Sequence, residues 1–275
     1  MRRPARTALS DREIADYTAF ACRTARIAGR KILSHFRERI DIVNKAARGS
    51  FDPVTIADRE AERAIRAEIG RKYPRHGILG EEQGHSPGTE RFTWVIDPID
   101  GTRAFILGQL HWGVLIALND GARPIAGVMH QPYTGEMFTG SRLGAFATRG
   151  RNRIALRTRR CSRLEDAMVC ATDPAMFTGR READAFHRVA RKAKLRRYGG
   201  DCYIYCLLAS GFVDLAIESG LKPYDIQALV PIIEAAGGIV TTWSGGKPYE
   251  GGQIVAAGDR RLHRIALGML APAAR

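Results

Sequence analysis

The chain has 275 residues, of which 45% are hydrophobic and 26% are charged, the proportions of a soluble globular protein. Its formal net charge of +14 favours anionic substrates and weak, non-specific attraction to nucleic acid. No apolar run approaches the ~18 residues of a membrane span, and the basic start of the chain lacks the apolar segment of a secretory signal. The five cysteines include no Cys-x-x-Cys pair, which indicates a reducing compartment, so we expect a cytoplasmic protein.

Two amphipathic helices are predicted near the start of the chain. A capping box of Ser10 and Glu13 begins the first, and its apolar residues recur at helical spacing to about Phe36. The second begins at Thr55-x-x-Asp58, where the aspartate taken alone would be a capping carboxylate. The polar residues 45–53 between them predict a loop.

Two predicted strands then end on carboxylates. The short apolar run 77–80 leads into Glu81, and the aromatic and β-branched run 92–96 leads into Asp97. The second strand is expected to stop at this aspartate, because Pro98 cannot donate a ladder hydrogen bond and restricts the residue before it.

A tight turn after this strand holds the rest of the motif. Asp100 lies one turn beyond the strand end, and Gly101 permits a positive φ or a close backbone approach. Thr102 is expected to cap a short helix over 103–106. Paired carboxylates beside a helix N-terminus suit a metal held by oxygens with a phosphate on the free N–H groups. An isolated Asp-x-x-Asp-Gly is more often an ordinary turn.

The remainder of the chain shows two patterns of predicted secondary structure. Short strands and turns from residue 112 to 150 predict an antiparallel meander. After residue 151, strands and helices alternate, as in an α/β layer. Helices are predicted over 201–209 and 225–236, where N-capping is the simpler role for the opening aspartates. We expect the halves, about 10–150 and 151–275, to share one core in a single domain over 1–275.

Five carboxylates fall at boundaries between predicted elements. They are Asp58, Glu81, Asp97, Asp100 and Asp225. Oxygen ligands without cysteine or paired histidine favour a hard cation, Mg²⁺ rather than Zn²⁺. Such a set suits phosphoryl chemistry, in which one ion lowers the pKa of a water and another stabilises the leaving oxygen.

These motifs resemble those of the inositol monophosphatase and fructose bisphosphatase superfamily. The matching segments are 53–58, 80–82, 97–102 and 223–225 running into 234–238. The resemblance implies an α/β fold, a five-layered α-β-α-β-α sandwich that is usually a homodimer. It also implies hydrolysis of a small-molecule phosphate ester.

The resemblance assigns roles to individual residues. Two or three Mg²⁺ ions per site would be held by Glu81, Asp97, the Ile99 carbonyl, Asp100 and Asp225. Thr102 and Asp58 would orient and deprotonate the attacking water, with Glu81 as a further catalytic residue. The substrate-binding residues would be Glu81, Ile99, Asp100, Gly101, Thr102, Arg196, Asp201, Glu218 and Asp225.

Finer features are similar to the histidinol-phosphatase branch of this superfamily. They lie in segments 103–106, 111–113, 199–203 and 221–225. They imply hydrolysis of L-histidinol phosphate in histidine biosynthesis, with Arg196, Asp201 and Glu218 contacting the substrate. A solvated arginine and a helix cap are the simpler interpretations of the first two.

Other functions stay open at this point. Inositol monophosphatase or broader sugar-phosphate and nucleotide phosphatase activity is the alternative. A basic nucleic-acid-binding protein on a degenerate phosphatase scaffold is a distant one, and the intact carboxylate set argues against it. We expect no membrane partner and no specific nucleic-acid partner.

Overall fold

The structure of the chain is a computed structural model that describes residues 9–39, 41–44 and 53–275. The basic start of the chain and most of the predicted loop over 45–53 lie outside the described residues. None of the described helices is long and apolar enough to span a membrane.

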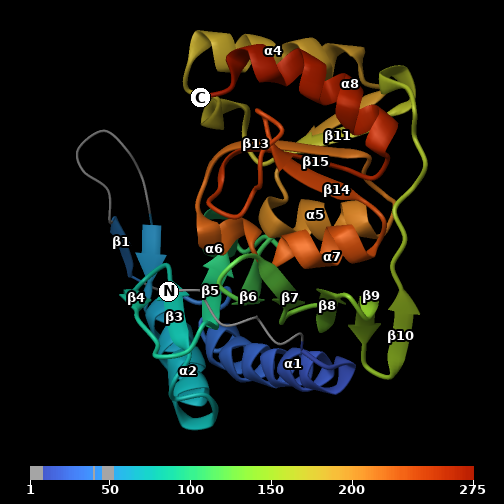
Figure 1. Cartoon of the computed structure of the whole chain (residues 1–275). Helices are drawn as coiled ribbons and strands as arrows, with labels where there is room; N and C mark the ends of the chain where they lie inside the picture. The colour runs from blue at the N-terminus through green and yellow to red at the C-terminus, as the bar shows by residue number, and fades with distance from the viewer. Residues whose placement is uncertain (1–8, 40, 45–52) are drawn as a thin grey trace.

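Five layers are stacked in the order α-β-α-β-α, which confirms the predicted sandwich (Figure 1). One outer layer consists of α1 (Asp11–Leu33) and α2 (Ile56–Lys72). The other outer layer consists of α4 (Arg180–Lys192) and α8 (Arg260–Leu270). Between the sheets lie α5 (Asp201–Ala209), α6 (Pro223–Ile226) and α7 (Leu229–Ala235). A further short helix, α3 (Thr102–Ile106), directly follows a strand of the first sheet, β5 (Thr93–Asp100).

The first sheet has eight strands in the order β10-β9-β8-β7-β6-β5-β3-β4. Their bounds are β3 Gly77–Gly80, β4 Gly84–Ser86, β5 Thr93–Asp100, β6 Gly113–Asn119, β7 Pro124–Gln131, β8 Glu136–Ser141, β9 Gly144–Arg149 and β10 Asn152–Ala155. Strands β5 to β10 form the predicted antiparallel meander. Strand β3 pairs parallel to β5, with Gly80 opposite Ile96, so Glu81 follows the end of β3 beside Asp97 of β5.

The second sheet has five strands in the order β12-β11-β13-β15-β14. Their bounds are β11 Met168–Ala171, β12 Leu195–Tyr198, β13 Leu215–Leu221, β14 Ile239–Thr242 and β15 Gly252–Ala257. A separate antiparallel pair is formed by β1 (Ile42–Asn44) and β2 (Pro53–Thr55). Three short 3₁₀ turns lie at Leu164–Asp166, Pro174–Met176 and Ala271–Ala273.

The described core has three apolar clusters: one between each outer helix layer and its sheet, and one that spans the middle helices from the first sheet to the second. The middle one joins Leu115 and Met129 of the first sheet to Ile232 of α7 and Ile254 of the second sheet. Because these residues come from both halves of the sequence, we propose that the chain folds as one domain.

Strand β5 does not stop at Asp97 as the sequence predicts, but continues to Asp100. Pairing with β6 shifts register between Asp97 and Asp100 and resumes with Asp100 opposite Gly113. The shift is a bulge that takes Pro98 out of the ladder, so its missing N–H costs no hydrogen bond. The bulge therefore re-aims both aspartates within one strand.

The predicted helix over 225–236 is also divided, into α6 and α7. Pro231 cannot donate to the carbonyl four residues earlier, which belongs to Gln227. The side chain of Gln227 is held by Asn119, which donates to its amide oxygen at 2.8 Å, and it donates to the Tyr249 carbonyl at 2.9 Å. The division leaves Asp225 in a short helix of its own.

Candidate active site

The motif on β5 is built around Asp97, which is only 2% exposed. Its Oδ1 accepts a hydrogen bond from the Ile99 backbone N–H at 3.0 Å. This bond closes the bulge on itself, and it fixes the orientation of both the carboxylate and the Ile99 peptide.

The turn between β5 and α3 depends on Gly101. Its φ of 92° lies in the left-handed region, and a Cβ there would lie 2.5 Å from the His111 carbonyl oxygen. The sequence predicts that Thr102 caps this helix, and that prediction is wrong: Gly101 is the N-cap of α3, and Thr102 is the first residue inside the helix. The Thr102 hydroxyl is therefore free of the capping role.

That hydroxyl instead connects two predicted site residues. Its Oγ1 lies 3.0 Å from the Ile99 carbonyl oxygen and 3.4 Å from Oδ1 of Asp58. A hydroxyl has one hydrogen to donate, so these two acceptors compete for it. The structure thus brings together Thr102 and Asp58, which are 44 residues apart in the chain.

Asp58 is fully buried at the third position of α2. Its Oδ2 accepts from the backbone N–H of Thr55 at 2.8 Å and from the Thr55 hydroxyl at 2.6 Å. Burial raises its pKa to about 6, against the lowering effect of these bonds. Asp58 is thus a capping carboxylate whose other oxygen faces Thr102.

The carboxylates at the element boundaries repel one another. Burial raises the pKa of Asp97 well above its usual range, and Glu81, Asp100, Asp225 and Asp58 raise it further, in that order. The pKa of Asp100 is raised in the same direction by burial, then by Asp225. Four or more acids in one region keep each other from ionising, so positive charge placed among them would be strongly favoured.

Asp225 belongs to this group although it lies in the C-terminal half of the sequence. It is the third residue of α6, and its Oδ2 accepts from the Lys222 backbone N–H at 2.7 Å. Burial raises its pKa to about 7, the Lys222 bond opposes this, and Glu81 and Glu218 raise it. Helix α6 contacts β5, and Asp225 raises the pKa of Asp97 and Asp100.

The donor chemistry of this group fits Mg²⁺, since every side chain in it binds through oxygen and all are acids in a desolvated region. Across the residues that the structure describes, however, no three Asp, Glu, His or Cys side chains are already arranged to hold a metal ion.

Asp201 lies next to this group. It is the first residue of α5, after the N-cap Gly200, and its φ of 44° is unusual for a residue with a Cβ. Burial raises its pKa to about 7, Glu218 adds to the rise, and Arg103 opposes it. Gly200, and not Asp201, is the N-cap residue of α5, so the helix-cap interpretation of Asp201 does not hold.

Glu218 and Arg196 lie in contrasting environments on the second sheet. Glu218 is 2% exposed and accepts from the Thr172 backbone N–H at 2.9 Å, from the Thr172 hydroxyl, and from the Tyr205 hydroxyl at 2.9 Å. Its negative charge raises the pKa of Asp100 and of Asp201. Arg196 lies on the edge strand β12 with an exposed side chain.

Two residues with clear structural connections to the site are absent from the sequence-based set. Thr55 orients Asp58 through both its N–H and its hydroxyl. Glu62, one helical turn after Asp58, is fully buried and accepts from the backbone of the Glu82 turn. The signal for both was their i−3 and i+4 spacing from Asp58, which places them beside it on α2.

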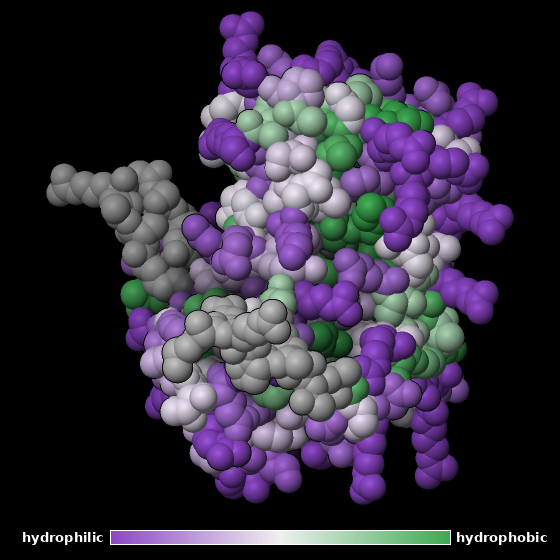
Figure 2. Space-filling model, viewed as in Figure 1, coloured by the Kyte–Doolittle hydropathy of each residue, from purple (hydrophilic) through white to green (hydrophobic). Residues whose placement is uncertain are grey.

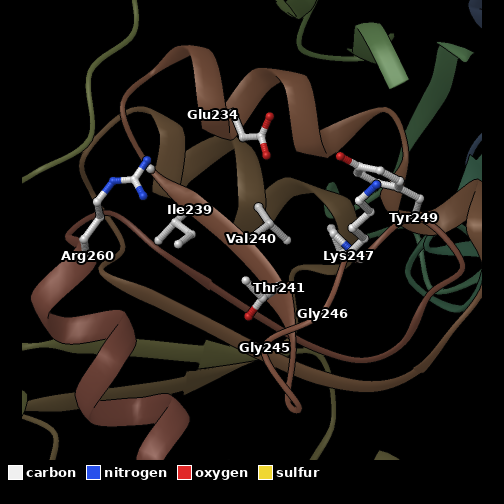
Figure 3. A pocket seen from close by; sticks show the side chains of 11 residues that line it. Glu234, Ile239, Val240, Thr241, Gly245, Gly246, Lys247, Tyr249 and Arg260 are labelled. Atoms are coloured by element: carbon white, nitrogen blue, oxygen red, sulfur yellow. The ribbon is translucent and has the colours of Figure 1, made fainter. Parts of the chain in front are cut away.

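A separate cavity of about 440 Å³ lies between α7, β14, the loop before β15 and the start of α8 (Figure 3). Glu234, Lys247 and Arg260 line it together with Tyr249 and Thr241, and none of the predicted site residues does. Its exposed charges have mixed sign and include only one carboxylate, so it does not offer the paired acids that the chemistry above requires.

Fold and site together define a class: a layered α/β protein whose desolvated carboxylates gather beside a short helix that begins at a glycine turn. Among proteins of this class, the chain belongs to the inositol monophosphatase family, whose family model matches residues 13–274. It is thus an inositol monophosphatase-family phosphatase. The members of this family are phosphoric monoester hydrolases that generally depend on Mg²⁺ and act on small phosphate esters.

Relatives with different names match most of the chain. The chloroplastic bifunctional phosphatase IMPL2 of Arabidopsis thaliana is 42% identical over 273 residues, 95% of this chain and 77% of the relative. A histidinol-phosphatase of Chlorobaculum parvum is 33% identical over 89% of this chain and 92% of its own. Nus factor SuhB of Vibrio cholerae is 35% identical over the same shares of the two chains.

Solved structures agree with this family. An inositol monophosphatase from Zymomonas mobilis is 39% identical, with a TM-score of 0.83 over 95% of this chain and 99% of that chain. The suhB protein of Bartonella henselae is 27% identical, with a TM-score of 0.84 over 93% and 98%. The same layered fold therefore extends over nearly the whole chain.

Proposed function

We propose that the chain is a Mg²⁺-dependent phosphomonoesterase that hydrolyses L-histidinol phosphate to L-histidinol and phosphate, in histidine biosynthesis. The observation that carries the substrate assignment is Asp201, a strained and desolvated carboxylate beside the acidic group. A histidinol-phosphatase among the relatives supports the same substrate.

Glu81, Asp97, the Ile99 carbonyl, Asp100 and Asp225 would hold two or three Mg²⁺ ions per site. When bound, these ions would lower the pKa of a water and stabilise negative charge on the leaving oxygen. The bulge in β5 serves this arrangement, because it holds the Asp97 carboxylate and the Ile99 peptide in one fixed relation.

Thr102 and Asp58 would position the attacking water and receive its proton, with Glu81 assisting. The hydroxyl of Thr102 lies 3.4 Å from an Asp58 oxygen, so the threonine can accept from a water while it donates to the aspartate. The pKa of Asp58, raised to about 6 by burial, suits a general base near neutral pH. The backbone N–H groups of Gly101 and Thr102, at the start of α3, would bind the phosphate.

The organic part of the substrate would meet Asp201, Glu218 and Arg196. Histidinol phosphate carries a protonated amine, and a desolvated ammonium requires an opposite charge. Asp201 supplies it, and a cation there would return its raised pKa toward the ordinary range. Because Arg196 is exposed on an edge strand, its contact with substrate would come through its long side chain or across a homodimer interface.

Inositol monophosphatase activity is the second candidate, favoured by the Zymomonas mobilis structure. Glu218 suits either substrate, because a carboxylate also accepts from sugar hydroxyls. We further propose a cytoplasmic homodimer with no specific nucleic-acid partner.

The test is a substrate panel with purified protein. Hydrolysis should cease in EDTA and return with Mg²⁺, and kcat/KM should be higher for histidinol phosphate than for inositol 1-phosphate. Asp201→Asn should raise KM for histidinol phosphate about 10- to 100-fold, the value of one lost charge-assisted hydrogen bond, with a much smaller change for an aryl phosphate.

Asp184→Asn is the matched control, since it removes an exposed carboxylate on α4. A wide preference for inositol phosphate would replace the histidinol assignment with the second candidate. Full turnover in EDTA would exclude the metal mechanism altogether.

A further inference from the structure

Helix α2 contains a second buried carboxylate, one turn beyond Asp58. The side chain of Glu62 is fully buried, and its Oε1 accepts from Nε of Arg66 at 2.8 Å. Its two oxygens also accept from backbone N–H groups, Oε2 from Glu82 at 2.8 Å and Oε1 from Gln83 at 3.0 Å. The carboxylate thus binds the turn that directly follows Glu81.

Arg66 extends this connection to the far side of the same turn. Its guanidinium donates to the Gly84 carbonyl at 2.5 Å and to the Ser86 hydroxyl at 3.0 Å, both on β4. Its side chain is 13% exposed. Together, Glu62 and Arg66 hold residues 82–86 against α2 through five hydrogen bonds, counting the one between them.

The chain makes room for this pair at Gly80, the last residue of β3. A Cβ at Gly80 would lie 2.4 Å from Oε1 of Glu62 and 2.9 Å from Nη2 of Arg66. The ion pair therefore packs against the backbone of Gly80, which precedes Glu81. It also hydrogen-bonds to the backbone of residues 82–84, which follow Glu81.

We propose that Glu62 and Arg66 are positioning residues that hold the Glu81 turn in the place where its carboxylate meets Mg²⁺. The inference rests on the proposed function, because it needs Glu81 as a metal ligand. Helix α2 then connects both sides of the site: Asp58 faces Thr102, and Glu62 fixes the turn that carries Glu81.

The energetics favour a positioning role over a purely stabilising one. A buried ion pair gains little net stability over well-packed apolar residues, because both charges lose their hydration. Residues that orient a metal ligand, in contrast, typically change metal affinity about 10- to 100-fold when they are removed.

The experiment measures Mg²⁺ binding directly by isothermal titration calorimetry, at a temperature well below unfolding. Arg66→Ala and Glu62→Gln should each raise the Kd for Mg²⁺ about 10-fold or more. Arg71→Ala is the matched control, because Arg71 forms an exposed pair with Glu68 on the same helix. It should leave the Kd within about 2-fold, as expected for an exposed pair.

Gly80→Ala provides an independent test, since it displaces the pair without removing either charge. It should raise the Kd in the same direction, and circular dichroism establishes that each variant is folded. If Arg66→Ala and Gly80→Ala lower the melting temperature yet bind Mg²⁺ as the wild type does, the pair is structural only and the proposal is wrong. If the wild type itself binds no Mg²⁺, the metal assignment fails and the positioning role fails with it.

Discussion

Thr102 illustrates how one side chain separates a structural role from a chemical one. Gly101 takes the N-cap position of α3, and the Thr102 hydroxyl lies between the Ile99 carbonyl and Asp58. The hydroxyl therefore serves no backbone N–H of the helix, and its loss should affect the site more than the fold.

Thr102→Ala should lower kcat about 100-fold or more, the usual value of a positioned proton-transfer group, with little change in KM. Thr102→Ser keeps the hydroxyl and should retain most of kcat. Steady-state kinetics beside a melting curve makes the comparison. A loss of ~1 kcal/mol of stability with kcat unchanged would mean that the residue acts only in the helix start.

At the scale of elements, the β5–α3 turn determines where the aspartates and the phosphate-binding N–H groups meet. Gly101→Ala should destabilise the fold by about 1–3 kcal/mol from the left-handed backbone, plus the clash with His111. Gly135→Ala is the control, because Gly135 has a φ of 75° and open space around its Cβ position. Urea unfolding of both variants isolates the clash, and equal losses would contradict the close approach.

The buried carboxylates at the element boundaries predict that the folding stability of the metal-free protein depends on pH. The pKa of Asp225 is raised to about 7, above an unfolded value of about 3.9. Between these values the folded protein retains a proton that the unfolded chain has lost, so this group destabilises the fold as pH rises. Buried histidines with lowered pKa values act in the opposite direction, namely His76, His130 and His263.

The wild type and Asp225→Asn contain the same histidines, so the difference between their unfolding free energies omits the histidine contribution. In EDTA, the variant should gain about 1–3 kcal/mol over the wild type between pH 4 and pH 8, because its amide does not ionise. Urea unfolding at the two pH values measures this gain. A constant difference between the two proteins would show that Asp225 has an ordinary pKa.

At the scale of the whole molecule, the net charge of +14 requires an account. On the face shown in Figure 2, hydrophilic side chains project from the upper and lower layers alike, with apolar areas between them. We expect weak binding to duplex DNA that falls steeply with salt, as phosphate contacts alone produce. Fluorescence anisotropy from 50 to 200 mM salt measures it, and a tight, sequence-selective complex at the higher salt would favour a nucleic-acid function.

Local sequence was enough for the order of elements and for the carboxylate motifs. The helix over 201–209 and the strand at 77–80 have the predicted bounds. These features depend on neighbouring residues, through apolar spacing, capping side chains and turn residues. The same motifs indicated the family, and with it the five-layered sandwich.

Local sequence could not predict the contacts between segments that are distant in the chain. Nothing near Pro98 reveals that β5 continues past it, because the bulge exists only in pairing with β6. The bonds from Glu62 to the Glu81 turn depend on α2 lying against the sheet. So does the contact of Thr102 with Asp58, which only the family resemblance indicated. Long-range packing sets these distances, whereas a single sequence records only which side chains are available to make them.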